Sequence, residues 1–142
     1  MDLSPKITNK SILLVDDSIS IRHTIKASLR AQGFSNFIEA ADGEKALKAT
    51  KLKRVDLIVC DWMMPNMSGL ELFSAVKNEE KSKNIPFILL TGNDQKENVT
   101  EAVKAGIKHY VVKPFNPYKL FEKIVELLQQ QVDEKKEEES SK

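Results

Sequence analysis

Five short apolar runs alternate along this chain with amphipathic stretches of helical period, and this alternation limits the possible folds most. The runs lie at Ser11–Val15, Asn36–Ala40, Asp56–Asp61, Pro86–Leu90 and Lys108–Val112. The central runs are continuously apolar, as is typical of parallel strands covered by helices on both faces. Five strand–helix units in about 120 residues therefore predict an α/β fold with a doubly wound, five-stranded parallel sheet. A TIM barrel would need eight such units and is excluded.

The stretches between the apolar runs predict helices. They cover about Ser18–Gln32, Glu44–Lys51, Ser68–Asn78 and Gln95–Ala105, and a last helix follows the cap Asn116 with Pro117 in first position. From about Asp133 the chain is rich in charge and is expected to form a disordered, solvated tail. The predicted organisation is an N-terminal extension over 1–9, one domain over 10–131 and a charged tail over 132–142.

Composition excludes several functional classes. A length of 142 residues fits one domain, and a net charge of +1 provides no broad field to hold nucleic acid or an anionic membrane. No apolar run approaches the ~18 residues of a membrane span, and Met1 to Lys10 has no signal-peptide core. The single cysteine, Cys60, excludes an intramolecular disulfide and Cys-rich zinc patterns. We therefore expect a cytoplasmic protein.

Polar and charged residues stand where the predicted strands end. They are Asp16 and Asp17 after the first strand, Asp61 at the end of the third, Thr91 after the fourth and Lys113 after the fifth. In an open parallel sheet, ligands bind outside the carboxyl ends of the strands. These side chains are therefore expected at one edge of the sheet, where they converge if their strands are adjacent.

Three neighbouring carboxylates require a compensating cation or a function. Two unit charges at ~4 Å repel by roughly 4 kcal/mol at an effective dielectric near 20. Mg²⁺ takes oxygen ligands and keeps waters for a phosphate, while Lys113 adds an ammonium and Thr91 a hydroxyl donor. This set suits phosphoryl transfer, in which a carboxylate can be the nucleophile and become an aspartyl phosphate.

Four motifs together resemble response-regulator receiver domains, especially single-domain chemotaxis regulators. They are Leu13-Leu14-Val15-Asp16-Asp17-Ser18, Asp61-Trp62-Met63-Met64-Pro65-Asn66-Met67-Ser68-Gly69, Leu90-Thr91-Gly92 and Tyr110-Val111-Val112-Lys113-Pro114-Phe115. The resemblance covers about Lys10 to Gln131. It implies a flavodoxin-like (βα)5 fold with strand order 2-1-3-4-5.

The resemblance also implies the roles of the acidic residues. Asp61 is the expected acceptor of a phosphoryl group from a phosphohistidine on a sensor histidine kinase. Asp17 is expected to bind Mg²⁺ directly, Asp16 mainly through water, and Met63 through its backbone carbonyl. No enzymatic turnover is implied beyond self-catalysed phosphotransfer and autodephosphorylation.

A second group of residues matches the switch of the family. Thr91 and Lys113 are expected to bind phosphoryl oxygens, with the Lys113–Pro114 peptide bond cis. Tyr110 matches the switch aromatic, which turns inward when Thr91 moves toward the phosphate. The surface formed by the last two helices and the strand between them then changes. Met63 and Asn93 differ from the commonest chemotaxis pattern, which leaves the lifetime of the phosphorylated state open.

Several outputs are compatible with this pattern. The expected protein is a monomer whose phosphorylated form binds a protein target, possibly a component of the flagellar motor switch. The alternatives are a phosphorelay shuttle to a histidine phosphotransfer protein and a regulator of another partner. A phosphatase of the haloacid dehalogenase type is disfavoured, because it needs two aspartates separated by one residue, whereas Asp16 and Asp17 are adjacent. The intact acid set also disfavours a phosphorylation-independent binding module.

Overall fold

The computed structural model describes residues 3–92 and 96–140. The elements in chain order are α1 (Pro5–Thr8), β1 (Ser11–Val15), α2 (Ile19–Arg30), β2 (Asn36–Ala40), α3 (Gly43–Leu52), β3 (Leu57–Asp61), α4 (Gly69–Lys77), β4 (Phe87–Gly92), α5 (Lys96–Lys104), β5 (His109–Lys113) and α6 (Pro117–Ser140). The predicted strands all form, with shifts of one or two residues at some ends.

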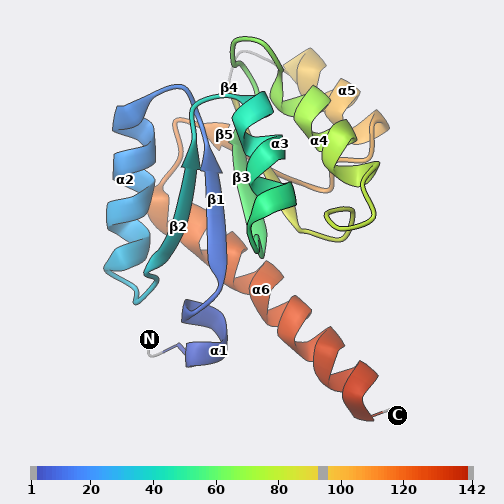
Figure 1. Cartoon of the computed structure of the whole chain (residues 1–142). Helices are drawn as coiled ribbons and strands as arrows, with labels where there is room; N and C mark the ends of the chain where they lie inside the picture. The colour runs from blue at the N-terminus through green and yellow to red at the C-terminus, as the bar shows by residue number, and fades with distance from the viewer. Residues whose placement is uncertain (1–2, 93–95, 141–142) are drawn as a thin grey trace.

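The five strands form one parallel sheet in the order β2-β1-β3-β4-β5, which confirms the predicted fold class and strand order (Figure 1). Strands β1, β3 and β4 are buried along almost their whole length, whereas the edge strands β2 and β5 are partly exposed. The continuously apolar runs are therefore the inner strands, because both of their faces are covered by helices.

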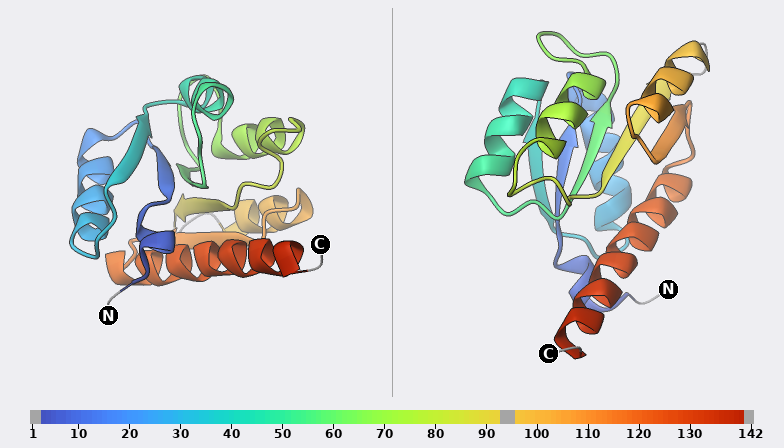
Figure 2. Two further views of the ribbon diagram at one scale, coloured as in Figure 1. Left: turned by 60° about the horizontal axis from the view of Figure 1, so that its bottom comes forward. Right: turned by 90° about the vertical axis from the view of Figure 1, so that its right-hand side faces the viewer.

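Helices cover the two faces of the sheet (Figure 2), and buried side chains form two cores beneath them. On one face α2 and α6 pack over the sheet through side chains such as Leu29 and Ile124. On the other face α3, α4 and α5 contribute residues that include Ala46, Leu72 and Ala102. This double cover leaves the ends of the strands accessible, so the carboxyl edge of the sheet is the place for a ligand.

Helix caps fix the path of the chain where it leaves β1 and where α4 begins after β3. The Ser18 hydroxyl accepts a hydrogen bond from the Ile21 N–H at the start of α2. Ser68 and Glu71 form a reciprocal capping box at the start of α4. Each cap stabilises the helix that directly follows a polar turn, and so holds the turn after β1 and the loop after β3.

The last helix differs from the expectation for the tail. We expected disorder from about Asp133, but α6 continues to Ser140, and residues 133–139 are exposed along it. Glu, Lys and Gln have favourable helix propensities, and the Gln129 side chain donates a hydrogen bond of 3.1 Å to Asp133 one turn later. The segment can therefore extend an already nucleated helix without burying a core of its own.

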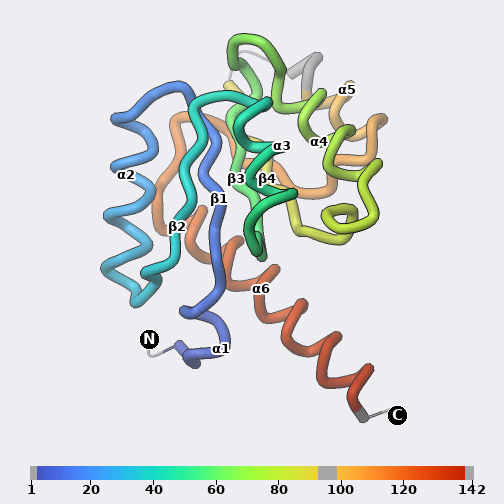
Figure 3. The backbone as a smooth tube through the Cα atoms, in the orientation of Figure 1, coloured from blue at the N-terminus to red at the C-terminus, as the bar shows by residue number. Residues whose placement is uncertain are grey.

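The two terminal segments meet beyond the amino edge of the sheet, where α1 lies beside α6 (Figure 3). Ile7 of α1 is 2% exposed and belongs to the core shared by α2 and α6. The N-terminal extension is thus anchored to the domain. No helix in the described ranges is long and apolar enough to cross a membrane.

Candidate functional site

Three carboxylates meet at the carboxyl edge of the sheet. Oxygens of Asp16, Asp17 and Asp61 all lie within 4.8 Å of one another. Asp16 and Asp61 are buried at 2% and 9% exposure, whereas Asp17 faces solvent. The acids therefore converge as the sequence predicted, because β1 and β3 are neighbouring parallel strands.

A lysine from the edge strand completes this cluster. The Lys113 Nζ lies 2.9 Å from Oδ1 of Asp61 and 3.8 Å from Oδ2 of Asp16. The following Lys113–Pro114 peptide bond is cis, in agreement with the prediction. One ammonium thus lies near two buried carboxylates. Because the cluster holds three carboxylates, it keeps an excess of negative charge.

Asp16 is the most constrained member of the cluster. Its Oδ1 accepts a 2.9 Å hydrogen bond from the Ser18 backbone N–H, and the Arg22 guanidinium donates to its backbone carbonyl. Burial raises the pKa of Asp16, and the charges of Asp61 and Asp17 raise it further, against the opposing effects of Ser18 and Lys113. The carboxyl is therefore costly to ionise unless another cation is near.

One oxygen of the cluster lacks a hydrogen-bond partner. Oδ2 of Asp16 is buried and accepts no hydrogen bond in the described structure. Buried acceptors are nearly always satisfied, so this oxygen indicates a missing donor or cation. Clustered carboxylate oxygens are the donor set preferred by hard divalent cations such as Mg²⁺. The residues therefore fit a magnesium ion.

The loop between β3 and α4 is fitted tightly around the end of β3. The Gly69 N–H donates a 2.8 Å hydrogen bond to the Trp62 carbonyl, and a Cβ at Gly69 would collide with the Asp61 carbonyl oxygen. Asn66 has a φ of 70°, which lets the loop turn back. The Met63 side chain is exposed, which suits a residue whose expected contribution is its backbone carbonyl.

The two predicted switch residues occupy different environments. Thr91 is completely buried, and its hydroxyl lies 3.5 Å from the Gly92 carbonyl. Its strand neighbour Leu90 pairs with Asp61, so Thr91 lies at the same edge as the acids. Tyr110 is 42% exposed on β5. Asn93, which differs from the commonest chemotaxis pattern, lies outside the described residues.

Sequence reasoning missed three supports of the cluster. Ser18 begins the helix predicted after the first strand, but its backbone N–H also orients Asp16. Arg22 joins the turn after β1 to Glu39 on β2, and Gly69 allows α4 to approach Asp61. Glycine after Ser68 was a visible signal, although it indicated only a helix start. No local sequence pattern indicates the role of Arg22, because its contacts form only when β1 and β2 lie side by side.

Comparison with known proteins identifies the family. The model of the response regulator receiver domain matches residues 12–125. Chemotaxis protein CheY of Pseudomonas aeruginosa is 41% identical over 118 residues, which are 83% of this chain and 95% of that protein. CheY-3 of Vibrio cholerae is 40% identical over 82% of this chain and 89% of its own length.

Solved structures agree with this assignment. The chemotaxis response regulator CheY4 of Vibrio cholerae has a TM-score of 0.76 at 36% identity, with 84% of this chain and 99% of that chain covered. The receiver domain of the sensor histidine kinase PA1611 from Pseudomonas aeruginosa, solved with a magnesium ion in its active-site cleft, has a TM-score of 0.77 at 27% identity, covering 85% and 98%. The chain therefore belongs to the response regulator receiver domain family.

Proposed function

We propose that this chain is a phosphorylation-activated switch of a two-component system and accepts a phosphoryl group on Asp61 from a phosphohistidine of a sensor histidine kinase. The observation that carries this proposal is the meeting of Asp16, Asp17 and Asp61 with Lys113 at one edge of the sheet. Membership in the receiver family supports it. The protein acts as an acceptor and signal, without turnover of a separate substrate.

The reacting group is the Asp61 carboxylate. Its Oδ1 is held by Lys113, and no hydrogen bond to Oδ2 occurs within the described parts of the chain. A carboxylate oxygen attacks phosphorus as the P–N bond of the phosphohistidine breaks. The electron pair of that bond stays on the imidazole nitrogen, and a proton from solvent restores neutral histidine. The product is an aspartyl phosphate.

Magnesium is the proposed cofactor. The residues that would hold it are Asp17 directly, Asp16 mainly through water, Asp61 and the backbone carbonyl of Met63. When bound, Mg²⁺ neutralises charge on the transferring phosphoryl oxygens. The buried Oδ2 of Asp16, which accepts no hydrogen bond among the described residues, supports this assignment, as does the magnesium ion in the cleft of the PA1611 receiver domain.

The switch begins with a change of partner at Lys113. Once Asp61 carries a phosphoryl group, the ammonium pairs with a phosphoryl oxygen and the Thr91 hydroxyl moves toward another. Tyr110, which is 42% exposed, then turns into the space that Thr91 leaves. The surface of α5, β5 and α6 changes as the population shifts between two states. The names of the CheY relatives favour a chemotaxis target, and we propose the flagellar motor switch.

Intact-mass measurement after incubation with a small acyl phosphate, with and without Mg²⁺, tests phosphoryl acceptance. We expect one added phosphoryl group that is stable in acid, labile in base and dependent on Mg²⁺. Asp61→Asn should abolish labelling. Asp42→Asn is the matched control, because asparagine can replace the aspartate that caps α3. Labelling that persists in Asp61→Asn would refute the acceptor assignment.

Binding measurements test the output separately. Phosphorylated protein should bind a peptide from a flagellar motor switch component more tightly than unphosphorylated protein. Efficient transfer of the phosphoryl group to a histidine phosphotransfer protein, without any gain in peptide affinity, would instead assign a relay role. A gain that persists in Asp61→Asn would show that binding is independent of phosphorylation.

A further inference from the structure

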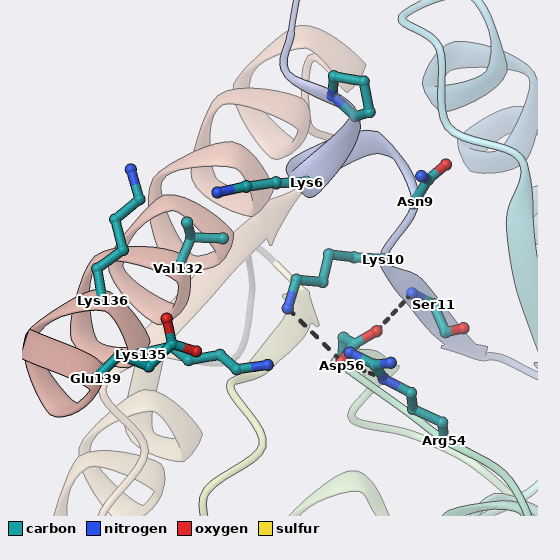
Figure 4. A pocket seen from close by; sticks show the side chains of 11 residues that line it. Lys6, Asn9, Lys10, Ser11, Arg54, Asp56, Val132, Lys135, Lys136 and Glu139 are labelled. Atoms are coloured by element: carbon teal, nitrogen blue, oxygen red, sulfur yellow. Dashed lines mark hydrogen bonds and ion pairs between the residues drawn. The ribbon is translucent and has the colours of Figure 1, made fainter. Parts of the chain in front are cut away.

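A basic pocket lies at the amino edge of the sheet, opposite the acidic cluster. It has a volume of about 640 Å³ and is formed by α1, the start of β1, the segment before β3 and the end of α6 (Figure 4). Asp56 lies at this edge, because it directly precedes β3, whereas Asp61 is the last residue of β3. The pocket is therefore separate from the proposed phosphorylation site.

The terminal segments provide most of the pocket. Among the described residues that line it, five precede residue 12 and four follow residue 125, whereas Arg54 and Asp56 alone lie inside the matched family region. The burial of Ile7 fixes α1 against the core, so the wall of the pocket is anchored. Most of the pocket is therefore formed by the two terminal segments that lie outside the part of the chain matched by the receiver-domain family.

Positive charge dominates the lining. Five cationic side chains face two acids, Asp56 and Glu139, and the cations are Lys6, Lys10, Arg54, Lys135 and Lys136. Figure 4 shows Lys6 reaching from α1 toward α6, and Lys135 reaching from α6 toward Asp56. Gathering like charges costs free energy, which a bound anion offsets.

Asp56 organises the base of the pocket but neutralises little of this charge. Its Oδ2 accepts a 2.8 Å hydrogen bond from the Ser11 N–H, and its Oδ1 lies 3.4 Å from Arg54 Nε and 4.0 Å from Lys10 Nζ. Lys6 and Lys135 form no ion pair within the described part of the chain. Two cations are thus held in place by Asp56, and two more are available to a ligand.

We propose that this pocket binds a small molecule that carries two or more phosphate groups. The planar Arg54 guanidinium suits phosphate oxygens, and lysines act as point charges toward the same group. The volume lies within the range of small-molecule sites, roughly 300–1,000 Å³. No aromatic side chain of the described residues lines the pocket, so recognition rests on the phosphates and not on stacking with a base.

Calorimetric titration of the full chain with pyrophosphate, tripolyphosphate and ATP tests the proposal. Mg²⁺ is omitted so that the acidic cluster does not take part in binding. The salt concentration is kept low. We expect saturable binding of one equivalent and, by mass action, a higher melting temperature. The double variant Lys6→Ala/Lys135→Ala should weaken binding at least tenfold. The control variant Lys45→Ala/Lys48→Ala removes two exposed lysines of α3 and should bind normally.

Amide chemical shifts locate the ligand independently of any variant. Binding should move the signals of Ser11, Asp56 and Val132. Equal losses of affinity in the two double variants, or shifts centred on Asp17 and Gly69, would overturn the proposal. Tighter binding of a polyglutamate peptide than of tripolyphosphate, with the same shifts, would also overturn it and assign the pocket to an acidic protein segment.

Discussion

Lys113 Nζ lies 2.9 Å from Oδ1 of Asp61, which joins the edge strand β5 to the central strand β3 across β4. The same ammonium lies 3.8 Å from Asp16, so one cation balances charge at two strand ends. The lysine side chain is 26% exposed, whereas those of Asp16 and Asp61 are 3% and 12% exposed. Lys113 is therefore more accessible than either of these buried carboxylates and can change partner.

Replacing Lys113 with alanine should uncouple phosphorylation from the switch. The variant leaves the Asp61 carboxylate without its ammonium, and we expect the free energy of unfolding without Mg²⁺ to fall by roughly 1–3 kcal/mol. Asp61 should still accept phosphate, but slowly. Intact mass measures acceptance, and amide and Tyr110 chemical shifts measure switching. Wild-type shift changes in phosphorylated Lys113→Ala would contradict this prediction.

Asp16→Asn should stabilise the metal-free protein at neutral pH, by about 1 kcal/mol. The pKa of Asp16 is raised above its ordinary value of 3.8, chiefly by burial, so the folded state binds more protons than the unfolded state just above that value. The contribution of Asp16 to stability therefore falls as pH rises through its raised pKa. The gain in the variant should vanish below pH 3.8, where the carboxyl is protonated in both states.

Urea unfolding at several pH values measures this effect, and fluorescence of Trp62, the chain's one tryptophan, follows Mg²⁺ binding. Asp16→Asn should also bind Mg²⁺ more weakly. A variant that is less stable than the wild type at neutral pH, yet binds Mg²⁺ equally well, would show that Asp16 is a structural residue and not part of a metal site.

Glu39→Gln should lower stability at neutral pH by less than about 1 kcal/mol, because the Glu39 side chain is one-third exposed. Hydrogen bonds of 2.9 Å from Lys26 and 3.1 Å from Arg22 lower the pKa of Glu39 below its ordinary value of 4.5. This stabilisation is present above pH 4.5 and is lost as pH falls through the lowered pKa. Wild type and variant should therefore converge in acid.

Thermal unfolding against pH measures the Glu39 effect. The exposed Glu122 provides a control, since Glu122→Gln should leave the curve close to that of the wild type. A stability difference between Glu39→Gln and wild type that stays constant into acid would mean that the carboxylate charge is not what stabilises the turn after β1.

Gly69→Ala should impair both folding and phosphorylation. The added Cβ would collide with the Asp61 carbonyl oxygen, which is backbone and cannot move aside alone, so we expect a loss of roughly 1–3 kcal/mol. Displacement of the loop after β3 should also slow labelling of Asp61. Gly43→Ala is the comparison, because the nearest atoms to its Cβ would belong to the Met67 side chain and not to the backbone. Equal effects of the two substitutions would contradict this account.

The C-terminal segment is the part of the chain whose structure the local sequence pattern did not predict. A charged composition predicted disorder after about Asp133, but residues 133–140 continue α6. Composition measures how little apolar surface a segment can bury, and that limit does not apply to a segment that extends a helix already anchored by Ile124 and Leu128. The lysines of this extension then contribute to the basic pocket.

The residue pattern alone was sufficient to predict the layers, the parallel sheet and the edge at which Asp16, Asp61 and Lys113 gather. Burial leaves a periodic signal in each segment, and parallel strands bring their carboxyl ends together. Three features became visible only in the folded chain: Oδ2 of Asp16 accepts no hydrogen bond among the described residues, Gly69 must lack a side chain, and the terminal segments form a pocket. These features depend on distances between segments far apart in the chain, which no local pattern encodes.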